Sequence, residues 1–185
     1  YDGTPLADSM VTVGGDGFAP GERFDIYASG SQSDVGSSSN TIPDLATLTH
    51  PAGFKLSNYS VVPIEGTLSV TQNTSPIVVT ASSQVKIYDG TPLTSQMHSV
   101  SGLPDGFTTE VSLQGSVTNV GDTAEGNHTV SSVKILRDGE DVTSNFSNIT
   151  TESGTLRVIP ASLAMDVAAD TIYDGQEQKL IPTVS

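Results

Sequence analysis

The hexapeptide YDGTPL at residues 1–6 recurs unchanged at residues 88–93, and its first three letters return at residues 173–175. The copies therefore begin 87 and then 85 residues apart. Self-similarity at a fixed period is typical of repeat proteins, in which each repeat is one supersecondary unit stacked on its neighbours. The sequence predicts two repeats and the beginning of a third.

The match between the repeats extends well past the hexapeptide. In chain order, the paired segments are Met10 with Met97, Asp16-Gly17-Phe18 with Asp105-Gly106-Phe107, Asn58-Tyr59-Ser60 with Asn145-Phe146-Ser147, and GTLSV at residues 66–70 with GTLRV at residues 154–158. We define residues 1–72 as unit one, residues 73–160 as unit two and residues 161–185 as the opening strand of a third repeat. The seams between them are short, which predicts stiff connections.

Residue composition favours strands over helices. Val, Ile and Thr supply 51 residues, against 26 for Leu, Ala and Met together, and β-branched side chains fit strands better than helices. Apolar residues recur at every second position, as in a half-buried strand; the alternating sets are Phe24, Ile26 and Ala28, then Ala46 and Leu48 in unit one, and Thr109, Val111 and Leu113, then Val133 and Ile135 in unit two. Turns are expected at residues 50–53 and 137–140.

These patterns predict an all-β fold made of two tandem, small, immunoglobulin-like β-sandwich modules in an elongated arrangement, plus the first strand of a third. A β-grasp layout of each module has the same strand pattern and stays open as the alternative. Each unit is expected to close around its own apolar interior.

Charge and apolar content exclude several classes of protein. Only 7 basic residues face 21 acidic ones, for a net charge of −14, so the positive surface that binds nucleic acid is missing. No apolar run approaches the roughly 20 residues of a membrane helix, and no basic-then-apolar leader is seen. The absence of cysteine excludes disulfides and thiolate metal sites, and is compatible with an exposed bacterial surface.

The Tyr-Asp-Gly motif is interpreted as a structural turn rather than a site. An aspartate can bond its own backbone two residues on, glycine permits a positive φ, and the tyrosine ring can pack against apolar neighbours. Aromatic residues at equivalent places, Phe18 with Phe107 and Tyr59 with Phe146, are predicted to be core anchors.

Acidic turns are the candidate ligands for a cation. Carboxylates of Asp105, Asp138, Glu140, Asp141 and of each Tyr-Asp-Gly copy are the oxygen donors that calcium takes, but their spacing fits no EF-hand loop. Residues 138–141 align with Pro-Ala-Gly-Phe at residues 51–54, so this cluster lies outside the shared scaffold. His50, His98 and His128 occupy no repeated position. We expect no metal site and no cofactor, with calcium as the alternative.

Catalytic signatures are also missing. The chain has no Gly-x-Ser-x-Gly elbow and nothing that organises a serine, a histidine and an acid, so it is predicted not to be an enzyme, with no catalytic, cofactor-binding or metal-binding residue. The Asn-x-Ser/Thr triplets are interpreted as incidental in a chain this rich in Ser and Thr; they begin at Asn58, Asn73, Asn127, Asn145 and Asn148. A covalent amide between Lys86 and Asn145 or Asn148 is a further, minor hypothesis.

Unit one lacks a segment that unit two has. An apolar stretch at residues 77–81, followed by Val85 and Ile87, precedes the second Tyr-Asp-Gly, whereas unit one starts at its Tyr-Asp-Gly. Residues 162–172 are an equivalent stretch without a unit of their own. Because an open sheet edge invites pairing, we expect this segment to supply the missing strand to a neighbouring molecule, or to fold back on unit one.

The ordered set VSGLPDGF at residues 100–107, GSVTNVG at 115–121 and DVTSNF at 141–146, together with the hexapeptide and GTLRV, resembles the mostly-β, glycine-rich repeats called MBG domains. The resemblance covers nearly the whole chain and supplies no catalytic residue. Unit one departs from it, being two residues shorter at residues 13–18 and reading Phe-Lys-Leu at residues 54–56.

The resemblance implies a tandem repeat of an extracellular bacterial surface or secreted protein. Its expected role is a non-catalytic stalk or spacer that projects a distal domain, with neighbouring repeats of the same chain as partners. The alternative is an adhesion module that binds a host glycan or protein through variable loops at residues 14–22 and 33–40.

Overall fold

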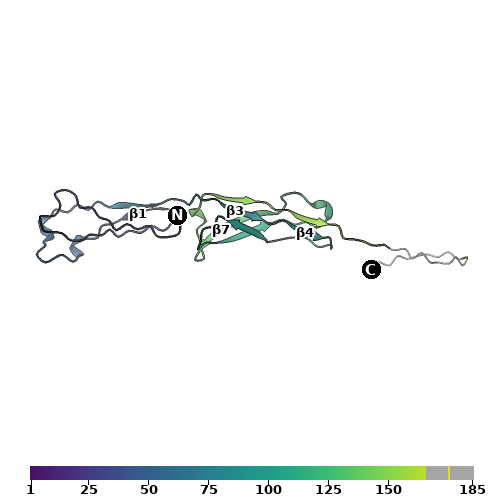
Figure 1. The fold of residues 1–185 in the computed structure, drawn as a ribbon, viewed down its shortest axis with the longest axis horizontal. Coiled ribbons are helices and arrows are strands. Elements are labelled where there is room, and N and C mark those ends of the chain that lie inside the picture. The colour runs from purple at the N-terminus through teal and green to yellow at the C-terminus, as the bar shows by residue number, and fades with distance from the viewer. Residues whose placement is uncertain (166–174, 176–185) are drawn as a thin grey trace.

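The computed structural model describes residues 1–165 and 175. Over this part the molecule is elongated, with unit one and unit two following one another along the long axis and the N-terminus near the middle, beside β3 (Ile77–Ala81) and β7 (Thr129–Arg137) (Figure 1). The described residues form several small sheets, and their helical residues belong to three-residue 3-10 turns: η1 (Leu45–Thr47), η2 (Leu56–Asn58), η3 (Val120–Asp122) and η4 (Thr143–Asn145). The mostly-β prediction is confirmed.

Unit two contains three of the sheets. In the first, β3 lies between β5 (His98–Ser101), to which it is antiparallel, and β9 (Ile149–Glu152), to which it is parallel. The second pairs β6 (Thr108–Gln114) with β7 and extends to β8 (Glu140–Asp141). The third pairs β4 (Gln84–Ile87) with β10 (Leu156–Ile159) in parallel. β3 and β4 thus bring the start of unit two against its end.

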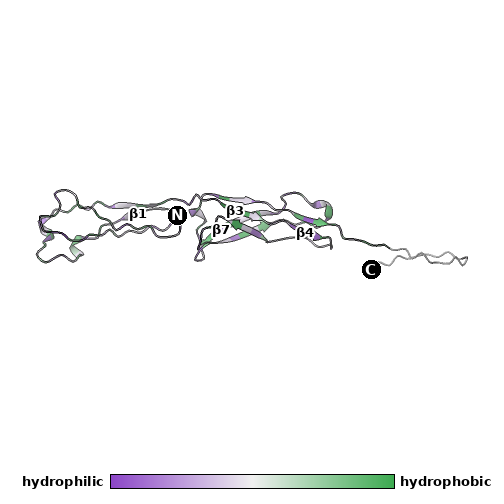
Figure 2. Cartoon of the chain, in the orientation of Figure 1, coloured by the Kyte–Doolittle hydropathy of each residue, from purple (hydrophilic) through white to green (hydrophobic). Residues whose placement is uncertain are grey.

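The core of unit two lies between these sheets. Ile77 of β3 and Ile135 of β7 are fully buried and contact Phe107 and Phe146, and a second cluster surrounds Leu156. Hydrophobic colour accordingly runs along the strands of unit two, whereas β1 (Gly36–Asn40) in unit one is pale (Figure 2). The alternation predicted around residues 109–113 and 133–135 is confirmed by β6 and β7, and Phe107 and Phe146 are core anchors as expected.

Unit one is much less complete. Its single described sheet pairs β1 with β2 (Gly66–Val70), and of its hydrophobic residues only Leu68 is buried. The expectation that each unit closes around its own apolar interior is therefore wrong for unit one. Phe18 and Tyr59, expected as core anchors, are only half-buried.

Two strands expected in unit one do not form. Phe24, Ile26 and Ala28 do alternate with exposed residues, but their segment pairs with no neighbouring strand. Around Ala46 the chain forms η1, because the Asp44 carboxylate accepts a hydrogen bond from the Ala46 amide at 3.0 Å and caps the turn. Pro43 also precedes this segment and cannot donate to a ladder.

The loops are partly as predicted. In the turn at residues 137–140, Asp138 and Gly139 both have positive φ (51° and 86°) and connect β7 to β8 as a tight hairpin. The turn at residues 50–53 also forms, since the Phe54 amide donates to the Pro51 carbonyl at 3.1 Å. Residues 33–40, expected as a variable loop, include β1 and are not a free loop.

No helix among the described residues is long and apolar enough to cross a membrane. At the other end of the chain, Ser162 to Met165 take no strand conformation. The rest of the segment expected to supply a strand, residues 166–172, lies outside the described residues, as do Tyr173 and Asp174 of the third copy.

Candidate functional site

The Tyr-Asp-Gly-Thr segment forms the same turn in both units. The Asp2 carboxylate accepts hydrogen bonds from the amide and the hydroxyl of Thr4, both at 2.7 Å, and Asp89 accepts the same pair from Thr91 at 2.9 and 2.8 Å. Gly3 and Gly90 have φ of +79° and +81°, which a residue with a side chain rarely adopts. The turn predicted at this motif is confirmed in both units.

Hydrogen bonds to these carboxylates stabilise their charged form. The Thr4 hydroxyl and amide lower the pKa of Asp2, and Lys86, followed by the two Thr91 donors, lowers the pKa of Asp89 to about 2. The Lys86 ammonium lies 2.7 Å from the Asp89 carboxylate. Both carboxylates consequently stay ionised further into the acid range than an ordinary aspartate.

Tyr1, the first residue of the motif, leaves its own unit and packs against unit two. Its ring meets Phe107 and Phe146 edge to face, with centroids 6.0 and 5.6 Å apart, a favourable arrangement for aromatic pairs. The Tyr1 carbonyl accepts a hydrogen bond from the Asn73 side chain at 3.0 Å, and the backbone nitrogen of Tyr1 donates to the Thr71 carbonyl at 2.7 Å. Tyr1 thereby covers the end of the unit-two core.

The turn glycine of unit one also contacts unit two. Arg137 lies over the Phe107 ring, with its guanidinium carbon 5.4 Å from the ring centroid, and donates to the Asp2 carbonyl at 3.4 Å. A Cβ atom at Gly3 would lie 1.3 Å from the Arg137 guanidinium and 2.9 Å from Phe107. Glycine is therefore favoured here by backbone conformation, and a side chain at this position would displace the Arg137 guanidinium from its contact.

A buried asparagine completes the contact. The Asn145 side chain donates to the Asp34 carboxylate at 3.0 Å and accepts from the Val35 amide at 3.2 Å, although it lies 110 residues further along the chain. The backbone carbonyl of Asn145 accepts a hydrogen bond from the backbone amide of Asn73 at 2.9 Å. We call this set of contacts around Tyr1, Gly3, Arg137 and Asn145 the junction, and it is the candidate functional site.

A second feature lies at the far end of unit one. A groove of about 710 Å³ opens between the extended residues 11–13 and 61–63, and its apolar floor includes Phe18, Phe54 and Tyr59, whose rings pack together. The Tyr59 hydroxyl donates to the Glu22 carboxylate, which raises the pKa of Tyr59, and accepts from the Ala19 amide at 3.0 Å. The polar end of this ring is thus satisfied within unit one.

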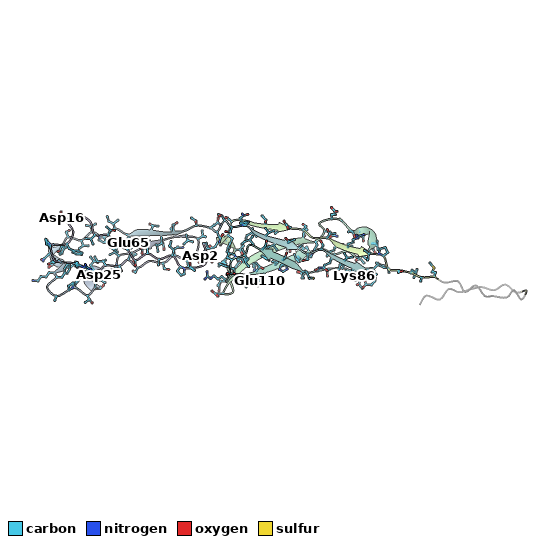
Figure 3. All side chains as sticks on the ribbon, in the orientation of Figure 1. Asp2, Asp16, Asp25, Glu65, Lys86 and Glu110 are labelled. Carbon is cyan, nitrogen blue, oxygen red and sulfur yellow. The ribbon has the colours of Figure 1, made fainter. Side chains whose placement is uncertain are left out.

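The acidic residues considered as calcium ligands do not converge. Within the described residues, no group of three or more carboxylate or histidine side chains could hold a metal ion. Asp141 instead accepts from the amide and hydroxyl of Thr143 at 3.0 and 2.6 Å, bonds that lower its pKa. The labelled carboxylates Asp16, Asp25, Asp2 and Glu110 are spread along the molecule (Figure 3).

The other candidate residues have structural partners. Asn145 bonds Asp34, while Asn148 donates to the Thr74 carbonyl at 3.2 Å and the Lys86 ammonium is held by Asp89. The structure therefore does not bring Lys86 to either asparagine. The side-chain amide of Asn127 donates to the Leu156 carbonyl at 3.0 Å and accepts from the Leu156 backbone amide at 2.7 Å. It therefore makes the same two hydrogen bonds as the backbone of a neighbouring strand.

The three histidines have different surroundings. His128 is fully buried and its two ring nitrogens lie 2.7 and 3.0 Å from the carbonyls of Ser82 and Ser95, so it ties two loops together. His50 stacks on Phe54 with ring centroids 5.1 Å apart, and His98 lies near the Gln96 carbonyl on the surface. Within the described residues, none of the three belongs to a group of three or more histidine or carboxylate side chains that could hold a metal ion.

Sequence reasoning singles out Tyr1 and Gly3 as part of a repeated turn, but not the residues of unit two that contact them. In the sequence, Asn145 stands out only as part of an Asn-x-Ser triplet and as a possible partner of Lys86, and Arg137 only as the first residue of a predicted turn. A signal did exist for the first, because Asn58 and Asn145 occupy the same position of the two units. Arg137 gives no such signal, since its equivalent is His50.

Comparisons with known proteins find no matching family model, no matching curated protein and no matching solved structure.

Proposed function

We propose that this chain is a non-catalytic structural repeat that serves as a stalk or spacer in a bacterial surface or secreted protein. The observation that carries the proposal is the junction, in which the Tyr-Asp-Gly turn of one unit is packed into the end of the next by Tyr1, Gly3 and Asn145. A contact made of the repeated motif itself is suited to be used again at each boundary of a longer array.

In this proposal the two units are tandem, immunoglobulin-like or β-grasp-like modules of the MBG kind, arranged lengthwise outside the cell. The two hydrogen bonds of Asn145, the aromatic contacts of Tyr1 and the short seam at residues 71–76 restrict bending between units. The excess of acidic residues, 21 against 7 basic ones, keeps such a surface solvated.

Small-angle X-ray scattering on the intact chain tests the spacer role. An elongated, rigid envelope is expected, together with no binding to glycan or matrix-protein arrays. The Asn145→Ala and Gly3→Ala variants should broaden the distribution of distances within the molecule, because both weaken the junction. A compact envelope would contradict the proposal. A measured catalytic turnover that is lost on substitution of a single residue would also contradict it.

Of the two loops named for the adhesion alternative, one lies where a ligand would have access. Residues 14–20 border the groove at the free end of unit one, where a ligand would have access, whereas residues 33–40 are taken up by β1 and by the contact of Asp34 with Asn145. Saturable binding of a glycan or matrix protein that is lost when residues 14–22 are replaced would favour adhesion over the spacer role.

A further inference from the structure

We propose that unit two bears tension: its entering segment, residues 73–87, and its leaving segment, residues 146–159, form a clamp that a pulling force must shear as a whole. The inference goes beyond the spacer role, on which it rests only for the source of the force. It depends on the parallel pairing of the two segments, on the direction in which each is loaded, and on the core beneath them.

The two segments of the clamp run side by side in the same direction along the unit. Asn73 pairs in parallel with Phe146, β3 pairs with β9, and β4 pairs with β10. The register is the same in both strand pairs, because each residue of β3 and β4 lies opposite the residue 72 positions further along the chain. The pairing therefore continues from the junction end of unit two to its opposite end.

Hydrogen bonds join the two segments on both sides of the gap between β3 and β4. The backbone amides of Ile77, Gln84 and Tyr88 donate to the carbonyls of Asn148, Thr155 and Ile159, at 2.9, 2.9 and 2.8 Å. In the gap itself, the Ser83 hydroxyl accepts from the Thr155 amide at 3.0 Å. Gly154 lies so close to the other segment that a Cβ atom there would be 2.4 Å from the Ala81 carbonyl oxygen. The clamp is thus continuous rather than two separate strand pairs.

The direction of the load follows from where the chain enters and leaves the unit. It enters unit two beside unit one, and it leaves after β10 at the opposite end (Figure 1). Tension along the molecule therefore pulls residues 73–87 towards unit one and residues 146–159 away from it. Because the two segments are parallel and their bonds cross from one to the other, these bonds are loaded together. In a peeling geometry they would break one after another.

The core resists the same sliding motion. Ile77 and Val79 of β3 and Leu156 and Val158 of β10 are all at most 2% exposed. A slip of one residue would turn such side chains from the core to the opposite face of the strand. β3 also lies between β5 and β9, so its movement breaks pairing on both of its edges. Since forced unfolding is governed by the barrier to unfolding, we expect a high force for this step.

Single-molecule pulling on the full chain in two geometries tests the proposal. The chain contains no cysteine, so a pair of introduced cysteines fixes the two points of attachment. Ser75→Cys/Ser162→Cys attaches at exposed positions before β3 and after β10 and loads the clamp in shear. Tyr88→Cys/Ser162→Cys is the matched control, because Tyr88 follows β4 directly and the force then peels β4 from β10.

The shear geometry should need a several-fold higher force than the peeling geometry. Unfolding in shear should occur in one step that lengthens the molecule towards about 300 Å, the extended length of residues 75–162. This comparison changes only the points of attachment, so it does not depend on a variant that weakens the fold.

Proline variants in the shear geometry locate the clamp within β4. The amides of Gln84 and Tyr88 both donate to β10, so alternation along the ladder turns the Lys86 amide to β10 as well. The Val85 amide faces the other edge of β4, which pairs with no strand among the described residues. Lys86→Pro should lower the shear force towards the peeling value, whereas Val85→Pro, at an edge position that tolerates proline, should leave it nearly unchanged. Lys86→Met controls for the lost ion pair with Asp89.

Two results would overturn the proposal: equal unfolding forces in the shear and peeling geometries, or equal losses of shear force in Lys86→Pro and Val85→Pro. Equal forces in a chain with an elongated scattering envelope would reject the clamp and leave the spacer role standing. A compact envelope with a high shear force would support the clamp and reject the spacer role.

Discussion

The side-chain amide of Asn145 donates to the Asp34 carboxylate at 3.0 Å and so joins residues 111 positions apart in the chain. Asn145 is buried, and its oxygen is satisfied by the Val35 amide. In this way one side chain of unit two holds the two residues of unit one that immediately precede β1. The stiffness of the molecule is expected to depend on this pair more than on the seam that connects the units.

Removing the Asn145 side chain should therefore loosen and destabilise the protein. Asn145→Ala leaves the Asp34 carboxylate and the Val35 amide without their partner. The loss of a hydrogen-bond partner for such a polar group lowers the free energy of unfolding by about 1–3 kcal/mol. Urea unfolding measures this loss, and scattering measures the added bending. Asn148→Ala, which removes an exposed bond to the Thr74 carbonyl, is the matched control, with an expected effect within about 0.5 kcal/mol. Equal effects would argue against the role given to Asn145.

Tyr1 should contribute through its ring. Tyr1→Ala removes two edge-to-face contacts, with Phe107 and Phe146, each worth about 0.5–1.5 kcal/mol beyond area burial. The free energy of unfolding should fall by about 1–3 kcal/mol in a denaturant titration. Tyr27→Ala serves as the control because Tyr27 is 61% exposed, and its stability should be almost unchanged. If the two variants are alike, Tyr1 does not cover the unit-two core in solution.

The two turn glycines separate backbone strain from junction packing. Gly3→Ala and Gly90→Ala both place a side chain at φ near +80°, which costs about 1–2 kcal/mol. Only Gly3→Ala brings a Cβ against Arg137 and Phe107, since Gly90 has open space around it. Gly3→Ala should thus be the more destabilising variant and alone should increase bending in scattering. A Gly90→Ala variant that bends the molecule equally would contradict this assignment.

Acid should weaken the turn at Asp89. Lys86 and Thr91 lower the folded-state pKa of Asp89 to about 2, below its ordinary value of 3.8. A depressed pKa contributes stability that is present above the unfolded-state pKa, and this contribution is lost as the pH falls from about 4 through about 2. An NMR titration of the Asp89 carboxyl should show the low value.

The Lys86→Met variant checks the cause. The pKa of Asp89 should rise towards its ordinary value because the largest contribution is removed, and it should remain lowered by the two Thr91 donors. A titration of Asp89 that does not respond to the loss of Lys86 would show that the ion pair at 2.7 Å is not maintained in solution.

His128 is expected to be structural. His128→Leu keeps an apolar side chain in the core but removes the ring N–H that donates to one of the two carbonyls it contacts, Ser82 or Ser95, at about 1–3 kcal/mol for a group that stays unsatisfied. Thermal unfolding should shift to clearly lower temperature. The control His98→Leu, at an exposed position, should have little effect, and added zinc should stabilise neither the parent nor the variants.

Local features were predictable because they depend on a few neighbouring residues. The Asp-x-Thr bonds and the positive φ of Gly3 and Gly90 follow from Tyr-Asp-Gly-Thr itself, and the alternation in β6 and β7 indicated their strands. Unit one shows the limit of this reasoning. Phe24, Ile26 and Ala28 have the same alternation, yet they lie in no ladder, because a strand also requires partners that the pattern does not supply.

The amino-acid sequence by itself determined the repeat, the turns at Tyr1-Asp2-Gly3 and Tyr88-Asp89-Gly90, the preference for strands and the excess of acidic residues, since these depend on composition and on contacts within three residues. Only the tertiary structure decided that Tyr1 packs on the following unit and that Asn145 holds Asp34. The reason is physical: burial and cross-strand hydrogen bonds depend on which distant segments meet, and two segments with similar sequences differ when only one of them has its neighbour.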